Sequence, residues 1–432
     1  MFKCVKQNRV IYYMQFAKDS SKIIKHLIPN IERCGAYNTL DKDPTFTASL
    51  ENLLSILYSE IHEGHNYVKT HVSPNLKPIL RREIITPVVY GGKYFPDDIK
   101  GFIDKNIMYQ LVYYYKIGSR TFKILFGICT DKDMDNIEKY NGYAEYICNW
   151  LYICNKFSPQ ESSTTMSFYI YLTSFKKTLP RDGSAILSSP HVNTAYTYGN
   201  REKNEIIIFR EEEWKKTFIH ETFHSFNFDF RDREVIPIQE YIKSIYPVQS
   251  DYLICEAYAE TWSRILNAVF SSYYSLKDKD DKTSFFLYAK FTLQCERLFS
   301  ILQLNKMLGF MNMEYSDLTN LENMKCDALR KMYREDSNVL SYYVVTGLFM
   351  NDYHNFLQWC SKNNSNIFRF TASVYTVDSF IGFMKEQYGN PSLLRAIDCM
   401  KKKYRENKKY LKKTTRMSAV EINPYLSNNA AK

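Results

Sequence analysis

The stretch that decides the fold is residues 205–228, which read EIIIFREEEWKKTFIHETFHSFNF. Its opening, residues 205–209, is apolar and β-branched enough to form a strand that is buried on both faces. Apolar side chains then recur at helical spacing, and three glutamates at residues 211–213 suit the positive N-terminal end of a helix. We therefore expect a buried strand followed directly by a mainly buried helix over residues 211–228.

The centre of that helix, HETFH at residues 220–224, fits the pattern H-E-x-x-H. Because an α-helix has 3.6 residues per turn, His220 and His224 lie one above the other on one face and can share a metal ion. Glu221 projects about 100° away from His220, beside the ion, where it can take a proton from metal-bound water. This spacing predicts a catalytic zinc site with Glu221 as the general base.

A catalytic zinc ion takes three protein ligands and keeps a fourth position for water. The best candidate for the third ligand is Glu256, on a predicted helix over residues 251–274. Glu256 and Glu260 are four residues apart, and such a like-charge pair costs about 0.2–0.5 kcal/mol. The conflict disappears if Glu256 binds zinc while Glu260 accepts a hydrogen bond from a ligand histidine. Arg264, one turn further on, can balance Glu260.

HETFH followed by EAYAE at residues 256–260 resembles the gluzincin branch of zinc metallopeptidases, which includes the thermolysin-like families. The resemblance covers residues 167–274, under a third of the chain. It implies a peptidase that uses Zn²⁺, with Glu221 as general base and acid and Glu260 behind the ligands. The ligands that it implies are His220, His224 and Glu256.

The same resemblance implies a small mixed sheet whose antiparallel edge strand holds the backbone of a peptide or protein substrate. Our candidate for that edge is residues 190–198 (PHVNTAYTY), with Asn193 and Ala195 as substrate-binding residues. The family's Tyr or His that stabilises the oxyanion has no clear match in this sequence. The candidates for that role are Tyr342, Tyr343 and His354.

The sequence as a whole predicts an α+β fold, in which a zincin-like mixed sheet with its active-site helix is followed by a mainly α-helical C-terminal subdomain. Further strands are expected at residues 122–127, 167–173 and 185–198. Further helices are expected at residues 45–63, 135–155, 285–307, 317–333, 339–360 and 376–413. We divide the chain into an α-rich N-terminal region (1–115), the metallopeptidase core (116–275), the helical subdomain (276–395) and a basic tail (396–432).

The net charge of +10 is concentrated near the C-terminus, where residues 395–416 hold ten basic and two acidic residues. A basic tail can bind nucleic acid or a particle surface. This leaves open a second function, that of a non-catalytic, zinc-stabilised structural or packaging protein. Glu221 favours the enzyme, because a purely structural zinc site does not need it.

No apolar run is long enough to span a membrane, so we expect no membrane span. Ten cysteines without a compact framework are typical of mostly reduced, buried thiols in the cytoplasm, which disfavours a secreted protease. The overall texture resembles proteins of large cytoplasmic DNA viruses, which implies a viral protein that could be associated with the virion.

A second histidine pair, HEGH at residues 62–65, is one residue shorter than the zinc motif. Its histidines are three residues apart, and no third ligand suggests itself. We interpret it as a surface feature.

Overall fold

The computed structural model describes residues 14–31, 33–34, 44–198, 203–230, 235–405 and 409–422. The chain divides into two compact units. Unit 1 comprises Met1–Ile56, Thr178–Val192 and Phe230–Lys432, and unit 2 comprises Leu57–Lys177 and Asn193–Asp229. Helix α4, Pro44–Tyr67, has residues in both.

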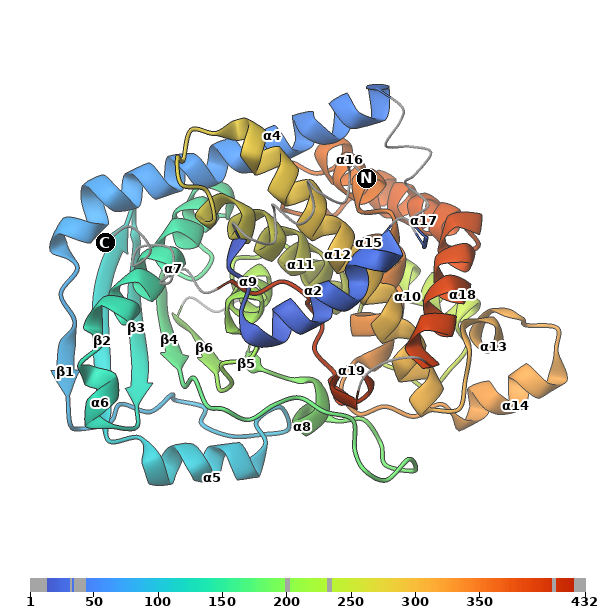
Figure 1. Ribbon diagram of the computed structural model, residues 1–432, viewed down its shortest axis with the longest axis horizontal. Coiled ribbons are helices and arrows are strands. Elements are labelled where there is room, and N and C mark those ends of the chain that lie inside the picture. The colour runs from blue at the N-terminus through green and yellow to red at the C-terminus, as the bar shows by residue number, and fades with distance from the viewer. Residues whose placement is uncertain are drawn as a thin grey trace. The chain divides into compact units, whose positions relative to one another are not determined.

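Unit 2 is built on a six-stranded mixed sheet with the strand order β1-β2-β3-β4-β6-β5 (Figure 1). Strands β3, β4 and β6 are parallel, and every other pairing is antiparallel. A two-residue turn joins β2 to β3, and its Gly118 has a φ of 59°, which glycine adopts without strain. The strands are β1 (Ile79–Arg81), β2 (Tyr109–Ile117), β3 (Arg120–Ile128), β4 (Thr165–Ile170), β5 (Ala195–Thr197) and β6 (Lys203–Ile208).

Helices cover both faces of this sheet. On one face, α5 (Asp97–Asn106) packs on a row of buried residues from adjacent strands, namely Val112, Leu125, Tyr169 and Ile207. On the other face lie α7 (Ile137–Phe157) and α9 (Trp214–Ser225); Phe168 of β4 meets Phe218 of α9 with ring centroids 5.2 Å apart. Burying each such side chain contributes about 1.5–3 kcal/mol, so this core holds α9 firmly against the sheet. Unit 2 also contains a π-helical turn (Val68–Val72), a 3-10 turn (Ser73–Asn75) and α6 (Asp131–Met134).

Unit 1 is helical. Its longest helix, α12 (Lys282–Phe310), is largely buried and packs against α2 (Lys18–Ile31), α11 (Ile254–Tyr274), α15 (Thr346–Asn351) and α18 (Pro391–Arg405). A π-helical turn, Leu340–Val345, runs directly into α15. The remaining helices are α8 (Ser189–Val192), α10 (Ile236–Ile245), α13 (Tyr315–Thr319), α14 (Met324–Met332), α16 (Tyr353–Asn363), α17 (Val374–Tyr388) and α19 (Lys409–Lys413).

The mixed helix-and-sheet class predicted from the sequence is confirmed. The buried strand at residues 205–209 corresponds to β6, and the helix after it corresponds to α9. That helix begins at Trp214 rather than at residue 211, because Glu213 has a φ of 62°, outside the helical region. The helices expected at 45–63, 135–155 and 285–307 correspond to α4, α7 and α12.

Several local predictions were wrong or incomplete. The single helices expected at residues 339–360 and 376–413 are each divided into more than one element. The extended stretch expected at residues 185–198 contains the short helix α8 and only three residues of strand, in β5. The helix expected at 317–333 is two helices. Asn323 is the N-cap of the second one, because its side chain accepts a hydrogen bond from the backbone N–H of Lys325. Strand β2 was not predicted in the region called α-rich.

The predicted basic tail is described only in part, since residues 406–408 and 423–432 lie outside the described residues. Residues 414–422 are mostly buried in unit 1, and Arg416 is 1% exposed. The domain boundaries at residues 115, 275 and 395 stay predictions.

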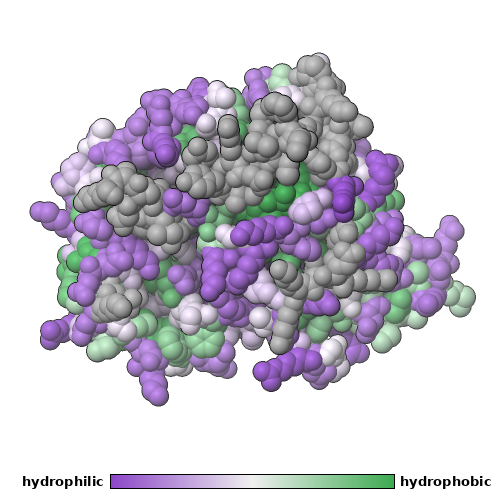
Figure 2. All heavy atoms as spheres, viewed as in Figure 1, coloured by the Kyte–Doolittle hydropathy of each residue, from purple (hydrophilic) through white to green (hydrophobic). Residues whose placement is uncertain are grey.

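One disulfide, between Cys34 and Cys399, was not foreseen. Seven further cysteines among the described residues are not in disulfides, as expected, and most of them are buried. Within the described ranges, no helix is both long and apolar enough to cross a membrane. Among the residues that Figure 2 colours by hydropathy, hydrophilic ones predominate, with smaller hydrophobic areas between them.

Candidate metal centre

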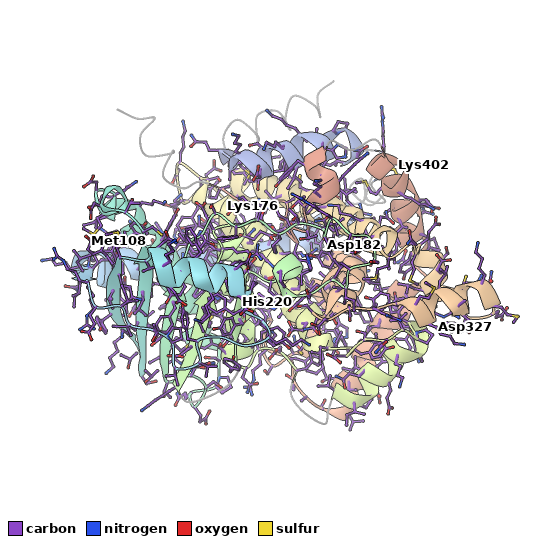
Figure 3. All side chains as sticks on the ribbon, turned by 90° about the horizontal axis from the view of Figure 1, so that it is seen from below. Met108, Lys176, Asp182, His220, Asp327 and Lys402 are labelled. Carbon is purple, nitrogen blue, oxygen red and sulfur yellow. A yellow bond between two sulfur atoms is a disulfide. The ribbon has the colours of Figure 1, made fainter. Side chains whose placement is uncertain are left out.

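Helix α9 carries the two histidines of the motif, of which His220 is labelled in Figure 3. The helix is almost entirely buried. His220 and His224 face each other, with their Nε2 atoms 3.2 Å apart. The ring centroids are 4.9 Å apart, and the ring planes are inclined by 78°. The predicted one-turn spacing therefore brings one nitrogen of each ring to a common point.

The start of α9 is fixed by a buried ion pair. Lys177 Nζ lies 2.6 Å from Glu213 Oε2, and the two side chains are 1% and 0% exposed. The backbone N–H of Lys177 also donates to the Glu212 carboxylate. Burial lowers the pKa of Lys177, and the charge of Glu213 opposes that shift. This pair was not predicted, because nothing in the local pattern links Lys177 to a helix that begins 37 residues later.

The end of α9 supplies a residue that the sequence analysis missed. Asn227 has a φ of 62°, a left-handed conformation that ends the helix and turns the chain back. Two residues later, Asp229 Oδ2 lies 2.5 Å from His224 Nδ1. A carboxylate here accepts a hydrogen bond from the Nδ1–H group, so the lone pair of His224 lies on Nε2, the atom that faces His220. The sequence did contain a signal for this turn. An Asn, a residue type that tolerates the left-handed conformation, follows the last apolar turn of the helix.

Glu221 follows His220 on the same helix and is 7% exposed. Its backbone carbonyl accepts a hydrogen bond from the Ser225 hydroxyl at 3.0 Å, which ties the last turn of the helix to it. The carboxylate is thus carried on a rigid, buried segment, as a general base requires.

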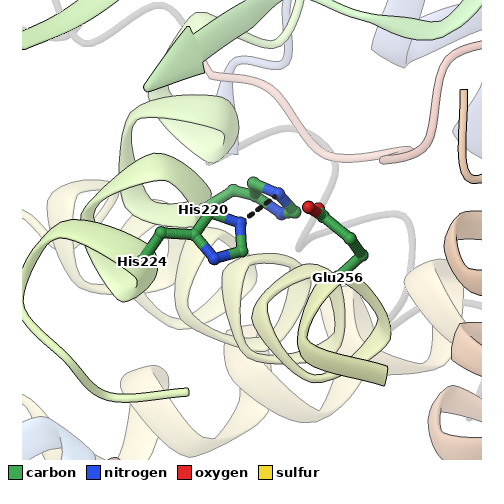
Figure 4. Close-up of side chains that lie close together, drawn as sticks. All are labelled: His220, His224 and Glu256. Carbon is green, nitrogen blue, oxygen red and sulfur yellow. Dashed lines mark hydrogen bonds between the residues drawn. The ribbon is translucent and has the colours of Figure 1, made fainter. Parts of the chain in front are cut away.

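Glu256 lies in the first turn of α11. Its Oε2 accepts a hydrogen bond from the hydroxyl of Tyr342 at 2.9 Å. One ligand atom from each of His220, His224 and Glu256 lies within 4.8 Å of the others (Figure 4). Within the part of the chain that the structure describes, this trio is the only group of three or more potential ligands so placed.

Glu260 lies one turn further along α11 and is fully buried. Its Oε1 accepts a hydrogen bond from Arg264 Nε at 2.8 Å, as the charge balance in the sequence suggested. Arg264 also donates to the Ser300 hydroxyl and to the backbone carbonyl of Tyr342. The bond from Glu260 to a ligand histidine stays a prediction, whereas the partner of His224 is Asp229.

The three oxyanion candidates differ in their contacts. Tyr342 reaches Glu256, whereas Tyr343 donates its hydroxyl to the backbone carbonyl of Thr415. The Nε2 of His354 lies 3.2 Å from the Ser49 hydroxyl, and burial lowers the pKa of its ring. Tyr342 is therefore the candidate in contact with a predicted ligand.

The predicted substrate-binding strand does form a sheet edge. In β5, Ala195 pairs with Ile208 of β6 in antiparallel register, and β5 is the last strand in the sheet order. Ala195 is 3% exposed, and Asn193, just before the strand, is 9% exposed. Their role in binding substrate stays a prediction.

The geometry and chemistry of the donors fit zinc. Two nitrogens bound to one tetrahedral zinc ion at about 2.0–2.1 Å lie about 3.3 Å apart, close to the 3.2 Å between the Nε2 atoms. Two imidazoles and one carboxylate also form a known ligand set of catalytic zinc, one that keeps a fourth position for water or substrate.

Comparison with known proteins gives no match: no family model, no curated protein and no solved structure matches this chain. The case for a function therefore depends on the residues of the site and their chemistry.

Proposed function

We propose that this chain is a zinc-dependent peptidase of the gluzincin type, with a zincin-like core and with His220, His224 and Glu256 as the zinc ligands. The observation that carries the proposal is the 3.2 Å separation of the two Nε2 atoms, with Asp229 bound behind His224. A carboxylate behind a ligand histidine is the usual companion of a bound metal, since it fixes the tautomer and raises the basicity of the ring.

The roles of the side chains follow from this arrangement. Bound zinc would polarise the scissile carbonyl and lower the pKa of water towards about 7. Glu221 accepts the proton of the attacking water and then delivers it to the leaving amine. Asp229 keeps the Nε2 lone pair of His224 directed at the ligand position.

The substrate is an extended segment of a peptide or protein. An antiparallel edge strand can pair with such a segment through backbone hydrogen bonds, which gives binding without dependence on sequence. The edge at β5 meets this requirement, so we assign substrate binding to Asn193 and Ala195. Oxyanion stabilisation by Tyr342, Tyr343 or His354 stays a prediction, because the one hydroxyl proton of Tyr342 is donated to Glu256.

The alternative, a structural or packaging protein that binds nucleic acid through its tail, lacks a specific observation in its favour. Lys401 lies 2.5 Å from Glu314, and Arg416 is buried against Glu421 at 3.0 Å. These two charges of the basic stretch are thus balanced within the protein.

The decisive experiment compares Glu221→Gln with Glu63→Gln, the matched change in the HEGH stretch. Both variants and the wild type are purified without added metal, assayed for zinc content, and incubated with a peptide mixture that is analysed by mass spectrometry. We expect about one zinc per chain in all three. Cleavage should be lost only in Glu221→Gln, because this variant keeps the ligands and removes the base. Cleavage by Glu221→Gln at the wild-type rate would exclude the mechanism.

The third ligand is tested separately by Glu256→Ala. We expect much less than one zinc per chain in this variant. Full zinc content would retain the metal but exclude Glu256 as a ligand.

A further inference from the structure

The C-terminal strap, which we define as residues 414–422, follows α19 and is not helical. It is buried almost throughout; Thr415, Ser418 and Ala419 are each fully buried. A buried, non-helical segment must have its backbone groups satisfied by partners elsewhere in the protein. These partners show what the strap is attached to.

Polar side chains on one side of helix α12 bind the backbone of the strap. The Glu296 carboxylate accepts hydrogen bonds from the backbone N–H groups of Ala419 and Val420, at 3.2 and 2.8 Å. Gln303 donates to the carbonyl of Arg416, and Lys306 donates to the carbonyl of Thr414 at 2.6 Å. These residues are spaced by seven and three positions, so they lie along the same side of the helix.

A second attachment joins the strap to the π-helical turn Leu340–Val345. The Tyr343 hydroxyl donates to the Thr415 carbonyl at 2.6 Å. The neighbouring residue, Tyr342, donates its own hydroxyl to Glu256 at 2.9 Å. Met417 of the strap packs in the same hydrophobic cluster as both tyrosines. Two consecutive residues of one turn therefore hold the strap and the proposed third zinc ligand.

Arg264 connects the same elements through charge. It donates to Glu260 and to the carbonyl of Tyr342, which fixes the turn from the side of α11. Burial raises the pKa of Glu296 to about 7, and the charge of Arg264 and the hydrogen bonds from the strap act against that shift. The contacts of α11, α12, the turn and the strap thus form one buried polar network.

We propose that the C-terminal strap is a positioning element for the metal centre, which acts through Tyr343 and Tyr342 to orient the carboxylate of Glu256. This rests on the proposed function, because it presupposes that Glu256 is a zinc ligand. Docking of the strap fixes the π-helical turn, and the turn holds the Tyr342 hydroxyl against Glu256 Oε2. π-helical turns recur at functional sites, which is consistent with this use.

The test uses the full chain loaded with Co²⁺, whose visible absorption spectrum reports the ligand geometry, together with the zinc affinity measured by competition with a chelator. The variant Tyr343→Phe removes the bond to the strap and leaves Glu256 and Tyr342 in place. The matched control is Tyr315→Phe, which removes another buried hydroxyl bound to a backbone carbonyl, that of Tyr388. Tyr342→Phe serves as the direct comparison.

We expect Tyr343→Phe to lower the zinc affinity about tenfold and to change the cobalt spectrum in the same direction as Tyr342→Phe. Tyr315→Phe should keep the wild-type spectrum and affinity. Ser418→Ala, which removes a hydroxyl that donates to Glu296 at 2.6 Å, should cause a smaller change of the same kind.

A wild-type spectrum and affinity in Tyr343→Phe and Ser418→Ala, alongside a change in Tyr342→Phe, would overturn the role of the strap and leave the proposed zinc site intact. A wild-type protein that binds neither cobalt nor zinc would overturn the proposed function, and this inference with it.

Discussion

Two helices of this protein carry a His-Glu pair followed by a second histidine, and only one of them builds a candidate site. On α9, the four-residue spacing brings the Nε2 atoms of His220 and His224 to 3.2 Å. On α4, His62 instead stacks on Tyr58 with ring centroids 5.5 Å apart. Glu63 is bound to the Tyr152 hydroxyl and to Lys156. The two spacings differ by one residue. The longer one lets two histidines share a ligand position, whereas the histidine pair with the shorter one makes ordinary helix contacts.

The surroundings of the two helices differ as much as their spacing. Every residue of α9 from Trp214 to Phe223 is buried, and a carboxylate stands behind His224. On α4, Glu63 is exposed, and its carboxylate pairs with a lysine that is itself 37% exposed. A buried site excludes water and strengthens electrostatic interactions, whereas an exposed ion pair contributes little. The motif therefore indicates chemistry only where the fold also buries it.

The largest expected effect separates the two histidine pairs directly. His224→Ala should weaken zinc binding more than about 100-fold, beyond the loss typical of a residue behind a ligand, because it removes a ligand itself. His65→Ala should leave zinc binding unchanged. In the wild type, free zinc at 1,000 times its dissociation constant should raise the free energy of unfolding by about 4 kcal/mol. Unfolding with and without a chelator measures this stabilisation. If the chelator lowered the free energy of unfolding equally in His224→Ala and His65→Ala, the two histidine pairs would not differ in zinc binding.

The next effect concerns the ion pairs that anchor the two helices. Lys177→Met removes the buried cation that lies beside the Glu213 carboxylate and should lower the free energy of unfolding by about 3–5 kcal/mol. Lys156→Met breaks the pairs with Glu60 and Glu63 on α4 and should lower it by less than about 1 kcal/mol. Urea denaturation of both variants checks the difference. Similar losses would mean that the buried pair is not what holds the start of α9.

The smallest effect concerns the neighbours that orient the histidines. Asp229→Asn should lower the zinc affinity about 10–100-fold, because an amide binds the Nδ1 proton of His224 more weakly than a carboxylate does. Tyr58→Leu, which removes the stacking partner of His62, should leave the zinc affinity unchanged. Both are measured by competition with a chelator. An unchanged affinity in Asp229→Asn would show that the short contact with His224 has no part in metal binding.

Much of this structure could be predicted where the pattern is local. The strand β6, the helix α9 and the paired histidines follow from hydrophobic periodicity and the spacing of five residues. Elements stabilised by distant partners could not be found in this way. The link from Cys34 to Cys399, for example, spans 365 residues. Strand β2 was missed for another reason, since the hairpin turn at Gly118 that joins it to β3 is a local signal that was not used.

The parts of the site that were missed have the same origin. Asp229 reaches His224 only because Asn227 adopts a left-handed conformation, which the residue type permits but does not require. The strap lies in a stretch whose lysines and arginines suggest a solvated tail. Its burial depends on Glu296 and Gln303, more than a hundred residues earlier in the chain. Side-chain pairing over such separations is a property of the fold, and no local pattern records it.

The most direct test of the central claim is X-ray absorption at the zinc edge, on protein purified without added metal. We expect one shell of nitrogen and oxygen ligands at about 2.0–2.1 Å with the outer scattering of two imidazole rings, and much less zinc per chain in Glu256→Ala. A sulfur shell at about 2.3 Å would instead assign the metal to cysteine thiolates. Either that result or the absence of zinc would contradict a site made of His220, His224 and Glu256.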